Sequence, residues 1–349
     1  EGRRVRRAVT TRRSAIRLVV LQLSSMAAAT PLLKVRTITV GITLEPDQPF
    51  GIWSKAIEGA SKVCSAASKR FSEAGFEVQT TRISTNPFEE WIDVTDAPGA
   101  LHTFRAIDEE LRRLEVGLFS AGPATSLQGI ALVPDVISMG PRISFSAMLA
   151  DPLDINFASA IAGAILRVSR ETAGGEGNFQ FCASCNVPPG IPFFPAAYHK
   201  GQASFAIGCE TSALVAHALP LAHGELPLAR RLLIDTFEKE MTPVQDIARQ
   251  LSALYKLPFD GIDASVAPFG SAPSLANSFE SIGLGRFGES GTLAVASLVT
   301  GALKSLSNIQ TTGYSGLMLP PCEDAGLAAR ASESGYRIHD LLAYSAVCG

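Results

Sequence analysis

Hydrophobic and polar positions along the chain predict strands and helices that follow one another. Residues 35–43, 76–83 and 116–121 are rich in β-branched or apolar residues, in part alternating with polar ones, which is typical of strands. Between them, residues 52–74 and 99–114 carry apolar residues at helical spacing. Strands separated by helices in this order predict an α/β protein.

The same alternation continues to the end of the chain. Further strands are expected at 179–185, 204–210 and 261–267. Further helices are expected at 154–172, 225–254, 274–282, 291–306, 322–333 and 338–346. Pro243 is expected to break the long helix at 225–254, because proline lacks the amide hydrogen that a helix interior needs. No internal repeat or clear linker is visible, so the interpretation is one α/β domain over residues 34–349.

The composition fits a sheet that is covered on both faces. The chain has 349 residues, 46% of them hydrophobic and 18% charged, with a mean hydropathy of +0.21. No apolar run approaches the roughly 18 residues of a membrane span, so no membrane partner is expected. Six cysteines in a chain of this length do not form a disulfide scaffold. A reducing, cytoplasmic compartment is the simpler interpretation.

The first residues differ in composition from the rest. Residues 1–25 hold seven arginines, no lysine and a single acid, Glu1. This basic segment, taken as 1–33, has three interpretations: an organellar transit peptide, a nucleic-acid-binding arm, or translated sequence upstream of a natural start at Met26. We favour the third, with the segment unstructured. Without residues 1–25, 23 basic and 32 acidic residues remain, a net charge of −9 that argues against a nucleic-acid partner.

Several familiar catalytic motifs are absent from the sequence. It contains no P-loop, no Gly-x-Gly-x-x-Gly after the first strand, no Gly-x-Ser-x-Gly and no His-Glu-x-x-His. Cys182 and Cys185 form a lone Cys-x-x-Cys, which is able in principle to bind zinc or to cycle as a dithiol. A second such pair is missing, and buried core cysteines are the preferred interpretation. The sequence therefore predicts no metal site and identifies no cofactor.

The best candidate for chemistry is His199, which follows a Pro-rich loop. Its near-neutral titration suits general acid–base work or the binding of an anion, and a structural hydrogen bond from the ring to the loop backbone is the equal alternative. Tyr198 stands beside it. Glu210 directly follows an apolar strand and is interpreted as a base, as a wall that repels anions, or as part of the cap of a helix that begins near Thr211. His199, Glu210 and Tyr198 are the predicted catalytic set.

Two further residues are predicted to bind substrate. Arg82, in a strand, is the candidate anion anchor, and Asp263 stands in another strand. Asp263 shares the ambiguity of Glu210, since a carboxylate after a strand is able to bind or to cap. The pair Glu323 and Asp324 is interpreted as a helix cap.

Five segments of the chain stand out as motifs. They are Lys34-Val-Arg-Thr-Ile-Thr-Val-Gly-Ile, Pro192-Phe-Phe-Pro-Ala-Ala-Tyr-His, Phe205-Ala-Ile-Gly-Cys-Glu, Asp263-Ala-Ser-Val-Ala-Pro-Phe and Gly313-Tyr-Ser-Gly-Leu-Met-Leu-Pro. In residues and order these segments resemble the uncharacterised domain-of-unknown-function-711 family, from about residue 34 to residue 349. The resemblance implies a pyruvate formate-lyase-like fold, a single large α/β barrel of about ten strands surrounded by helices. It brings no established activity.

That implied fold raises the question of glycyl radical chemistry. Such enzymes need a C-terminal Arg-Val-x-Gly-Tyr-like loop, and Gly313-Tyr314 is preceded here by Thr311-Thr312 instead. We therefore expect a barrel without the radical loop. The chain stops at Gly349, where the family typically continues. A truncated barrel with unpaired strands at the C-terminus is expected.

Two functions from different classes remain. The first is a non-radical enzyme that acts on a small carbonyl- or carboxylate-bearing metabolite at the barrel mouth. The second is a non-catalytic protein that binds or senses a metabolite on an inherited enzyme scaffold. The enzyme is slightly favoured, because barrels with converging polar residues are often catalytic. In both cases the partner is a small-molecule ligand, and the sequence leaves a homo-oligomer open.

Overall fold

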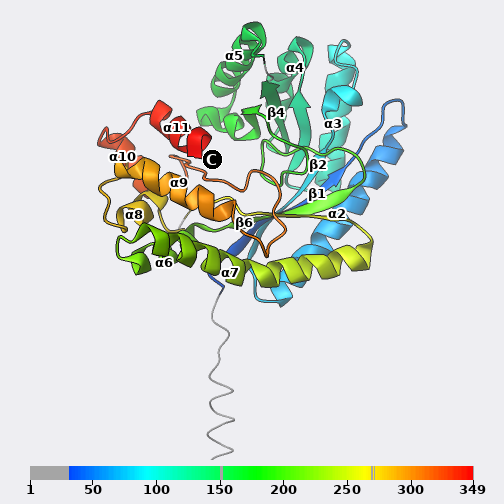
Figure 1. Ribbon diagram of the computed structural model, residues 1–349. Helices are drawn as coiled ribbons and strands as arrows, with labels where there is room; N and C mark the ends of the chain where they lie inside the picture. The colour runs from blue at the N-terminus through cyan, green and yellow to red at the C-terminus, as the bar shows by residue number, and fades with distance from the viewer. Residues whose placement is uncertain (1–30, 150–151, 269, 271, 349) are drawn as a thin grey trace, which may run out of the picture. The chain divides into compact units, whose positions relative to one another are not determined.

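The computed structural model describes residues 31–149, 152–268, 270 and 272–348 (Figure 1). The predicted basic leader at 1–33 therefore lies outside the described residues except for its last three positions, and so does Gly349. Within the described part of the chain, no helix is long and apolar enough to cross a membrane.

The centre of the fold is one sheet of seven strands, in the order β5-β4-β3-β2-β1-β6-β7. The strands are β1 Lys34–Ile42, β2 Val78–Thr85, β3 Phe119–Ala124, β4 Ile143–Leu149, β5 Phe181–Cys185, β6 Ser204–Glu210 and β7 Phe259–Asp263. The strands from β1 to β5 are parallel to one another, and β6 and β7 are parallel to each other. The two groups meet antiparallel where β1 pairs with β6. The sheet is therefore mixed.

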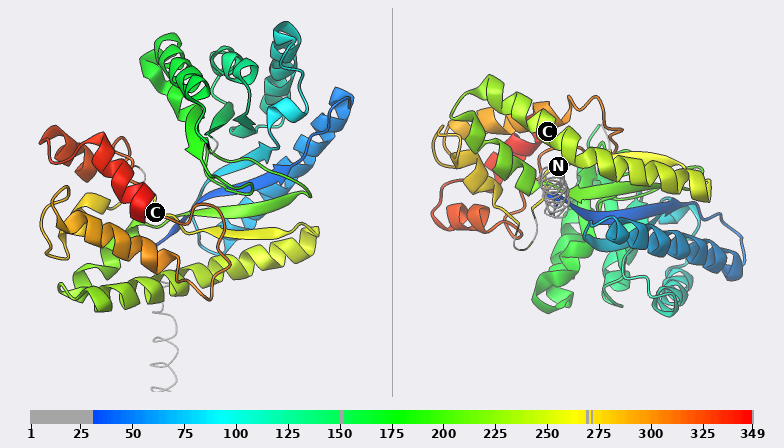
Figure 2. Two further views of the ribbon diagram at one scale, coloured as in Figure 1. Left: turned by 45° about the horizontal axis from the view of Figure 1, so that its top comes forward. Right: turned by 90° about the horizontal axis from the view of Figure 1, so that it is seen from below.

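The sheet is curled and open, which corrects the prediction of a closed barrel of about ten strands. Figure 2 shows the strands turning progressively from β5 to β7. Beyond β7 the described chain adds only two isolated parallel bridges, Ile262 with Thr311 and Val266 with Leu317. The outer edge of β5 pairs with no described strand. Without further strands to join these two edges, the sheet forms a half-barrel.

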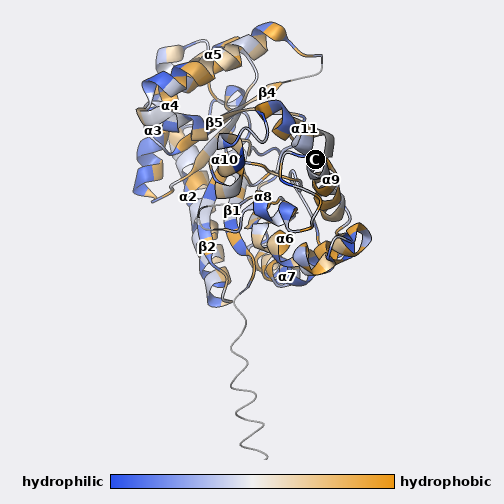
Figure 3. Cartoon of the chain, turned by 90° about the vertical axis from the view of Figure 1, so that its left-hand side faces the viewer, coloured by the Kyte–Doolittle hydropathy of each residue, from blue (hydrophilic) through white to orange (hydrophobic). Residues whose placement is uncertain are grey.

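Helices surround the sheet (Figure 1). They are α2 Phe50–Glu73, α3 Ala97–Arg113, α4 Leu127–Ile137, α5 Ile155–Glu171, α6 Ser212–Ala218, α7 Leu226–Tyr255, α8 Leu275–Glu280, α9 Gly291–Leu303, α10 Ala325–Ser332 and α11 Ile338–Cys348, with short 3-10 turns at Phe88–Glu90, Ala173–Gln180 and Pro220–Ala222. Figure 3 shows hydrophobic and hydrophilic residues mixed along these helices, as expected for amphipathic helices on a sheet. Side chains of Asp96, Ser126, Asp154, Ser274 and Asp324 cap five of them.

Helix α7 is continuous through Pro243, so the predicted break is wrong. Pro243 is exposed, whereas Met241, Val244 and Ala248 are buried on the other face of the helix. Burial of that apolar face on both sides of the proline holds the helix together despite one missing backbone hydrogen bond.

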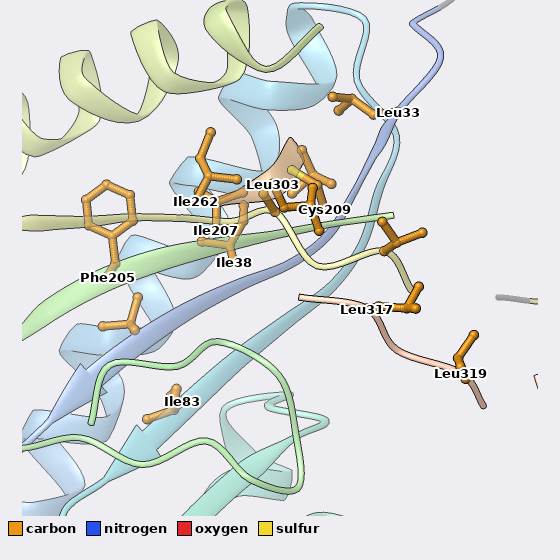
Figure 4. Close-up of a cluster of buried hydrophobic side chains, with 14 of the residues drawn as sticks. Leu33, Ile38, Ile83, Phe205, Ile207, Cys209, Ile262, Leu303, Leu317 and Leu319 are labelled. Carbon is orange, nitrogen blue, oxygen red and sulfur yellow. The ribbon is translucent and has the colours of Figure 1, made fainter. Parts of the chain in front are cut away.

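The two faces of the sheet differ sharply in residue size. The outer face carries large apolar side chains such as Ile38, Ile83 and Phe205, which pack under the helices (Figure 4). The inner, concave face alternates with it along each strand and carries small residues. Following the strand register from β1 outward, the inner residues include Thr37, Thr39, Gly41, Ser84, Ser120, Ser144, Ser146, Ala206 and Gly208.

The Pro-rich loop at 186–203 lies on this concave face. The Thr39 hydroxyl donates to the Pro192 carbonyl at 2.8 Å, and the Ser120 hydroxyl donates to the Ala197 carbonyl at 2.6 Å. The ring of Phe193 lies so close to Gly208 that a side chain at that position would clash with it. Small inner residues are therefore what allow the loop backbone to approach the sheet.

Candidate functional site

A cavity of about 910 Å³ remains on the concave face where the loop does not fill it. Its walls come from β1 and β2, from the segment that begins in β5 and runs to Pro188, from Phe193 and Phe194, from the segment at 313–318, and from α11. Segments that are far apart in the sequence thus build one cavity. Among the described residues, three cationic side chains line it, Arg36, Arg82 and Lys304, against a single carboxylate, that of Glu323.

Arg82 is the most constrained of these cations. It is only 6% exposed, its Nε donates to the Thr80 hydroxyl at 3.1 Å, and its guanidinium carbon lies 5.0 Å from the centre of the Phe194 ring. No carboxylate of the described residues lies within ion-pair distance of Arg82. Burial, and then the charge of Arg36, lower the pKa of Arg82 to about 9, although Glu323 opposes this. The guanidinium therefore remains protonated at neutral pH, as a buried charge without a contacting counterion.

Arg36 lies beside Arg82 and is better compensated. One of its terminal nitrogens donates to Gln79 Oε1 at 3.1 Å, and the other lies 3.9 Å from Glu323 Oε1. Gln79 in turn donates from Nε2 to Glu210 Oε2 at 2.7 Å. Burial lowers the pKa of Arg36, whereas the charges of Glu323 and Glu210 raise it. Glu210 therefore acts on the cavity through Gln79 and Arg36, and it does not line the cavity itself.

Lys304, which directly follows α9, lines the cavity from another wall. Its Nζ donates to the Tyr314 carbonyl at 2.8 Å and lies 5.9 Å from the centre of the Tyr314 ring. It makes no ion pair with any residue that the structure describes.

Asp263 fixes the cavity wall that carries Tyr314. Its buried carboxylate accepts hydrogen bonds from the backbone amides of Ser265 at 2.9 Å, Tyr314 at 3.1 Å and Ser315 at 3.0 Å, and from the Ser265 hydroxyl. Burial raises the pKa of Asp263, although these hydrogen bonds lower it. With its oxygens directed at this loop, Asp263 supports the cavity from behind.

His199 lies in a different part of the concave face. It is 3% exposed, its backbone amide donates to the Thr85 carbonyl at 2.8 Å, and its ring packs against Gly41. Its Nε2 lies 3.0 Å from the Gln202 carbonyl, which only accepts, so Nε2 carries the proton. Burial lowers the pKa of His199. The ring borders a space of about 10 Å³, apart from the large cavity.

Tyr198 ties the loop to itself. Its hydroxyl donates to the Val187 carbonyl at 3.0 Å, and its own carbonyl accepts from the Gly190 amide at 2.8 Å. Burial raises the pKa of this phenol. The predicted catalytic residues therefore do not converge, since His199, Tyr198 and Glu210 all lie outside the cavity lining.

Of the predicted site residues, Arg82 alone lines the large cavity. The sequence predictions missed Arg36, Lys304 and Phe194. For Arg36 a signal was present, because a charged residue inside a strand that is covered on both faces needs a reason to be there. Of the pair Glu323 and Asp324, which was predicted as a helix cap, Asp324 is confirmed: it accepts hydrogen bonds from the amides of Gly326 at 2.9 Å and Leu327 at 3.0 Å. Glu323 lines the cavity instead.

The Cys-x-x-Cys lies in the extended strand β5. At about 3.3 Å per residue the Cα atoms of Cys182 and Cys185 are about 10 Å apart, which is too far for a disulfide. Burial raises the pKa of Cys182 to about 12, so it is a neutral thiol at neutral pH. In the described ranges, no group of three His, Cys, Asp or Glu side chains is placed to hold a metal ion.

An open, mixed sheet surrounded by helices defines this protein as α/β. Its candidate site is the cation-lined cavity on the concave face of that sheet. The chain belongs to the family described as Uncharacterised ACR (DUF711), whose profile matches residues 26–349. The family resemblance of the sequence motifs is thereby confirmed.

Relatives in several bacteria match most of the chain. A UPF0210 protein of Desulfovibrio desulfuricans is 26% identical over 357 residues, spanning 90% of this chain and 77% of its own length. A UPF0210 protein of Halothermothrix orenii is 24% identical over 344 residues, spanning 90% and 76%. One from Bifidobacterium longum is 26% identical over 354 residues, with the same coverage. Family membership carries no specific activity.

Proposed function

We propose that this protein binds a carboxylate-bearing small molecule in the cavity, with Arg82 as its anchor and Arg36 beside it. One observation carries the proposal, namely the buried Arg82 guanidinium, which contacts no carboxylate among the described residues. A buried charge without a partner costs several kcal/mol. A bound carboxylate would remove that cost and would accept two parallel hydrogen bonds from the guanidinium fork.

The rest of the cavity suits a small organic acid. Its volume of about 910 Å³ lies within the range of small-molecule sites. Phe194 lies over the Arg82 guanidinium and, with Leu317 and Met318, provides apolar surface for the body of a ligand. In the described lining, three cations against one carboxylate favour an anion over a neutral or cationic molecule.

A catalytic form of this proposal keeps His199 as the acid–base residue, with Tyr198 and Glu210 as orienting groups. It requires the loop at 186–203 to open, because the His199 ring borders a separate small space. In the described part of the lining, no hydrogen bond joins a nucleophile to an activating base, and Cys182 is a thiol of raised pKa. Binding without turnover therefore has the better support. A kinship of the sheet with pyruvate formate-lyase-like barrels stays a prediction, and we propose no radical step.

Calorimetric titration with linear and branched carboxylates tests the proposal. Three proteins are compared: wild type, Arg82→Met, and the matched control Arg105→Met, in which an exposed arginine of α3 is replaced. We expect Arg82→Met to bind about 10- to 100-fold more weakly, the loss of a charge-assisted bidentate contact, and the control to bind like wild type. Equal binding by wild type and Arg82→Met would refute the proposal. Product analysis of the same samples decides between binding and turnover.

A further inference from the structure

The cavity holds two cationic positions on different walls. Arg82 and its neighbour Arg36 project from β2 and β1, whereas Lys304 follows α9 and is held by the Tyr314 carbonyl. That hydrogen bond uses one of the three donors of the ammonium group. Lys304 is exposed and Arg82 is buried, so the two cations mark the mouth and the floor of the cavity.

The sheet order shows how far apart the two positions are. From β2 the sheet passes through β1, β6 and β7 to the bridged segment that carries Tyr314. These four steps of about 4.8 Å amount to about 19 Å along the sheet, and the curl makes the straight path shorter. The walls that carry the two cations are thus several strands apart, and a ligand that contacts both cations has to extend across the cavity.

Apolar residues share the cavity lining with the two cations. Ile191, Phe193, Leu317, Met318 and Leu342 all line the cavity, and Leu317 is fully buried. A polar chain would lose its hydration along these walls without a hydrogen-bond partner, whereas methylene groups gain about 0.8 kcal/mol each on burial. The lining thus favours a ligand with an apolar middle.

We propose that the ligand is an elongated dianion, an aliphatic acid with a carboxylate at each end. One carboxylate binds Arg82 and Arg36 on the floor of the cavity, and the other binds Lys304 at its mouth. This inference rests on the proposed function and names its substrate class. It makes Lys304 the residue that distinguishes a diacid from a monoacid of the same length.

Calorimetric titration of matched acid pairs tests this inference. The probes are octanoate with octanedioate and decanoate with decanedioate, applied to wild type, to Lys304→Gln and to Lys62→Gln. Lys62 is the control, an exposed lysine of α2 that pairs with Glu58 outside the cavity. We expect wild type to bind at least one diacid about tenfold more tightly than its monoacid, as one exposed charge-assisted contact allows. Lys304→Gln should lose this preference and bind the diacid and the monoacid with similar affinity, and Lys62→Gln should behave as wild type.

The outcomes separate the two proposals. If wild type binds both monoacids through Arg82 but shows no preference for a diacid, the dianion inference is wrong and the proposed function stands. A diacid preference that persists in Lys304→Gln also overturns the inference. If neither acid of either pair binds to wild type, or if Arg82→Met binds them unchanged, the proposed function itself fails and the inference falls with it.

Discussion

Replacing Arg82 with methionine should stabilise the ligand-free protein while weakening its affinity for anions. Burial lowers the pKa of Arg82 to about 9, well below the ordinary value of a guanidinium. At about 1.4 kcal/mol per pKa unit, keeping the guanidinium charged in the folded state costs about 5 kcal/mol relative to the unfolded chain. Methionine fills much of the same space and carries no charge, so the substitution removes this cost.

Other contacts reduce the net gain. The variant loses the hydrogen bond from Arg82 Nε to Thr80, worth about 1 kcal/mol, and the contact with the Phe194 ring, worth about 1 kcal/mol. We therefore expect the free energy of unfolding to rise by about 1 to 3 kcal/mol. Urea denaturation should show a higher midpoint with an unchanged slope.

The pH dependence provides a second readout for the same residue. Because the folded pKa of Arg82 lies below its unfolded value, the unfolded chain binds more protons between about pH 9 and pH 12.5. The contribution of Arg82 to stability is therefore constant at neutral pH and rises with pH above about 9. The difference in stability between wild type and Arg82→Met should shrink as the pH rises through this window. Arg105→Met should show neither effect.

A loss of stability in Arg82→Met would refute this reasoning. If the variant unfolds with a free energy lower than that of wild type by more than about 1 kcal/mol, the protein itself compensates the Arg82 charge. The cavity would then hold no unsatisfied cation for a ligand to neutralise. A rise in stability without any effect on anion binding would leave the electrostatic argument intact and refute the binding role.

Three further predictions concern the residues around the cavity and the loop. Glu323→Gln removes the carboxylate that lies 3.9 Å from Arg36 and competes with a bound anion for it, so anions should bind about 3- to 10-fold more tightly by calorimetry. Weaker binding would contradict this competition. Burial lowers the pKa of His199 from 6.5, so the unfolded chain binds the extra proton first and wild-type stability should fall as the pH drops below about 6.5. In urea denaturation His199→Gln should lose that pH dependence, and an equal dependence in both proteins would contradict the prediction. Gly41→Ala would place a methyl group 2.2 Å from His199 Nδ1 and should lower the free energy of unfolding by about 1 to 3 kcal/mol. The control Gly51→Ala, whose methyl group meets no described atom within 4 Å, should change it by less than about 1 kcal/mol. Equal effects of the two substitutions would contradict the close packing of His199 against Gly41.

The hydrophobic pattern predicted the α/β class and most elements, and it failed where the pattern has no period. Helix α4 and strand β4 were not predicted. In α4 buried residues lie on several sides, among them Leu132, Val133, Pro134, Val136 and Ile137, so no amphipathic spacing appears in the sequence. An internal proline also argues against a helix when it is viewed in isolation. Burial on several sides is a tertiary property, and it outweighed the local signal.

The closure of the sheet could not be predicted from local pattern either. The sequence of a strand shows which of its faces is apolar, but it does not show which distant strand pairs with it. Pairing of β1 with β6 joins segments more than a hundred residues apart, and the bridge from Val266 to Leu317 joins residues about 50 positions apart. The family resemblance supplied the expectation of a closed barrel, and the described chain provides a sheet that ends at β5 and β7.

The candidate site was only partly predictable for a related reason. Arg82 was singled out as an anion anchor, but its significance depends on what does not contact it, which the sequence does not record. For His199 the two interpretations were balanced, and the geometry in this structure is the structural hydrogen bond, with Nε2 donating to the Gln202 carbonyl. Whether the ring also serves in catalysis stays a prediction, which turnover measurements on His199→Gln would test.

The antiparallel junction of β1 with β6 explains why the two neighbouring arginines of the cavity differ in their compensation by carboxylates. The loop covers Gly41 and Thr85, at the carboxyl ends of β1 and β2, and leaves Arg36, near the beginning of β1, and Arg82, in the middle of β2, facing the cavity. Because β6 runs in the opposite direction, its last residue, Glu210, arrives beside the beginning of β1. There it compensates Arg36 through Gln79 and stays out of the cavity. The strand directions therefore supply a counterion for one guanidinium at a distance, whereas the other, Arg82, contacts no carboxylate of the described residues.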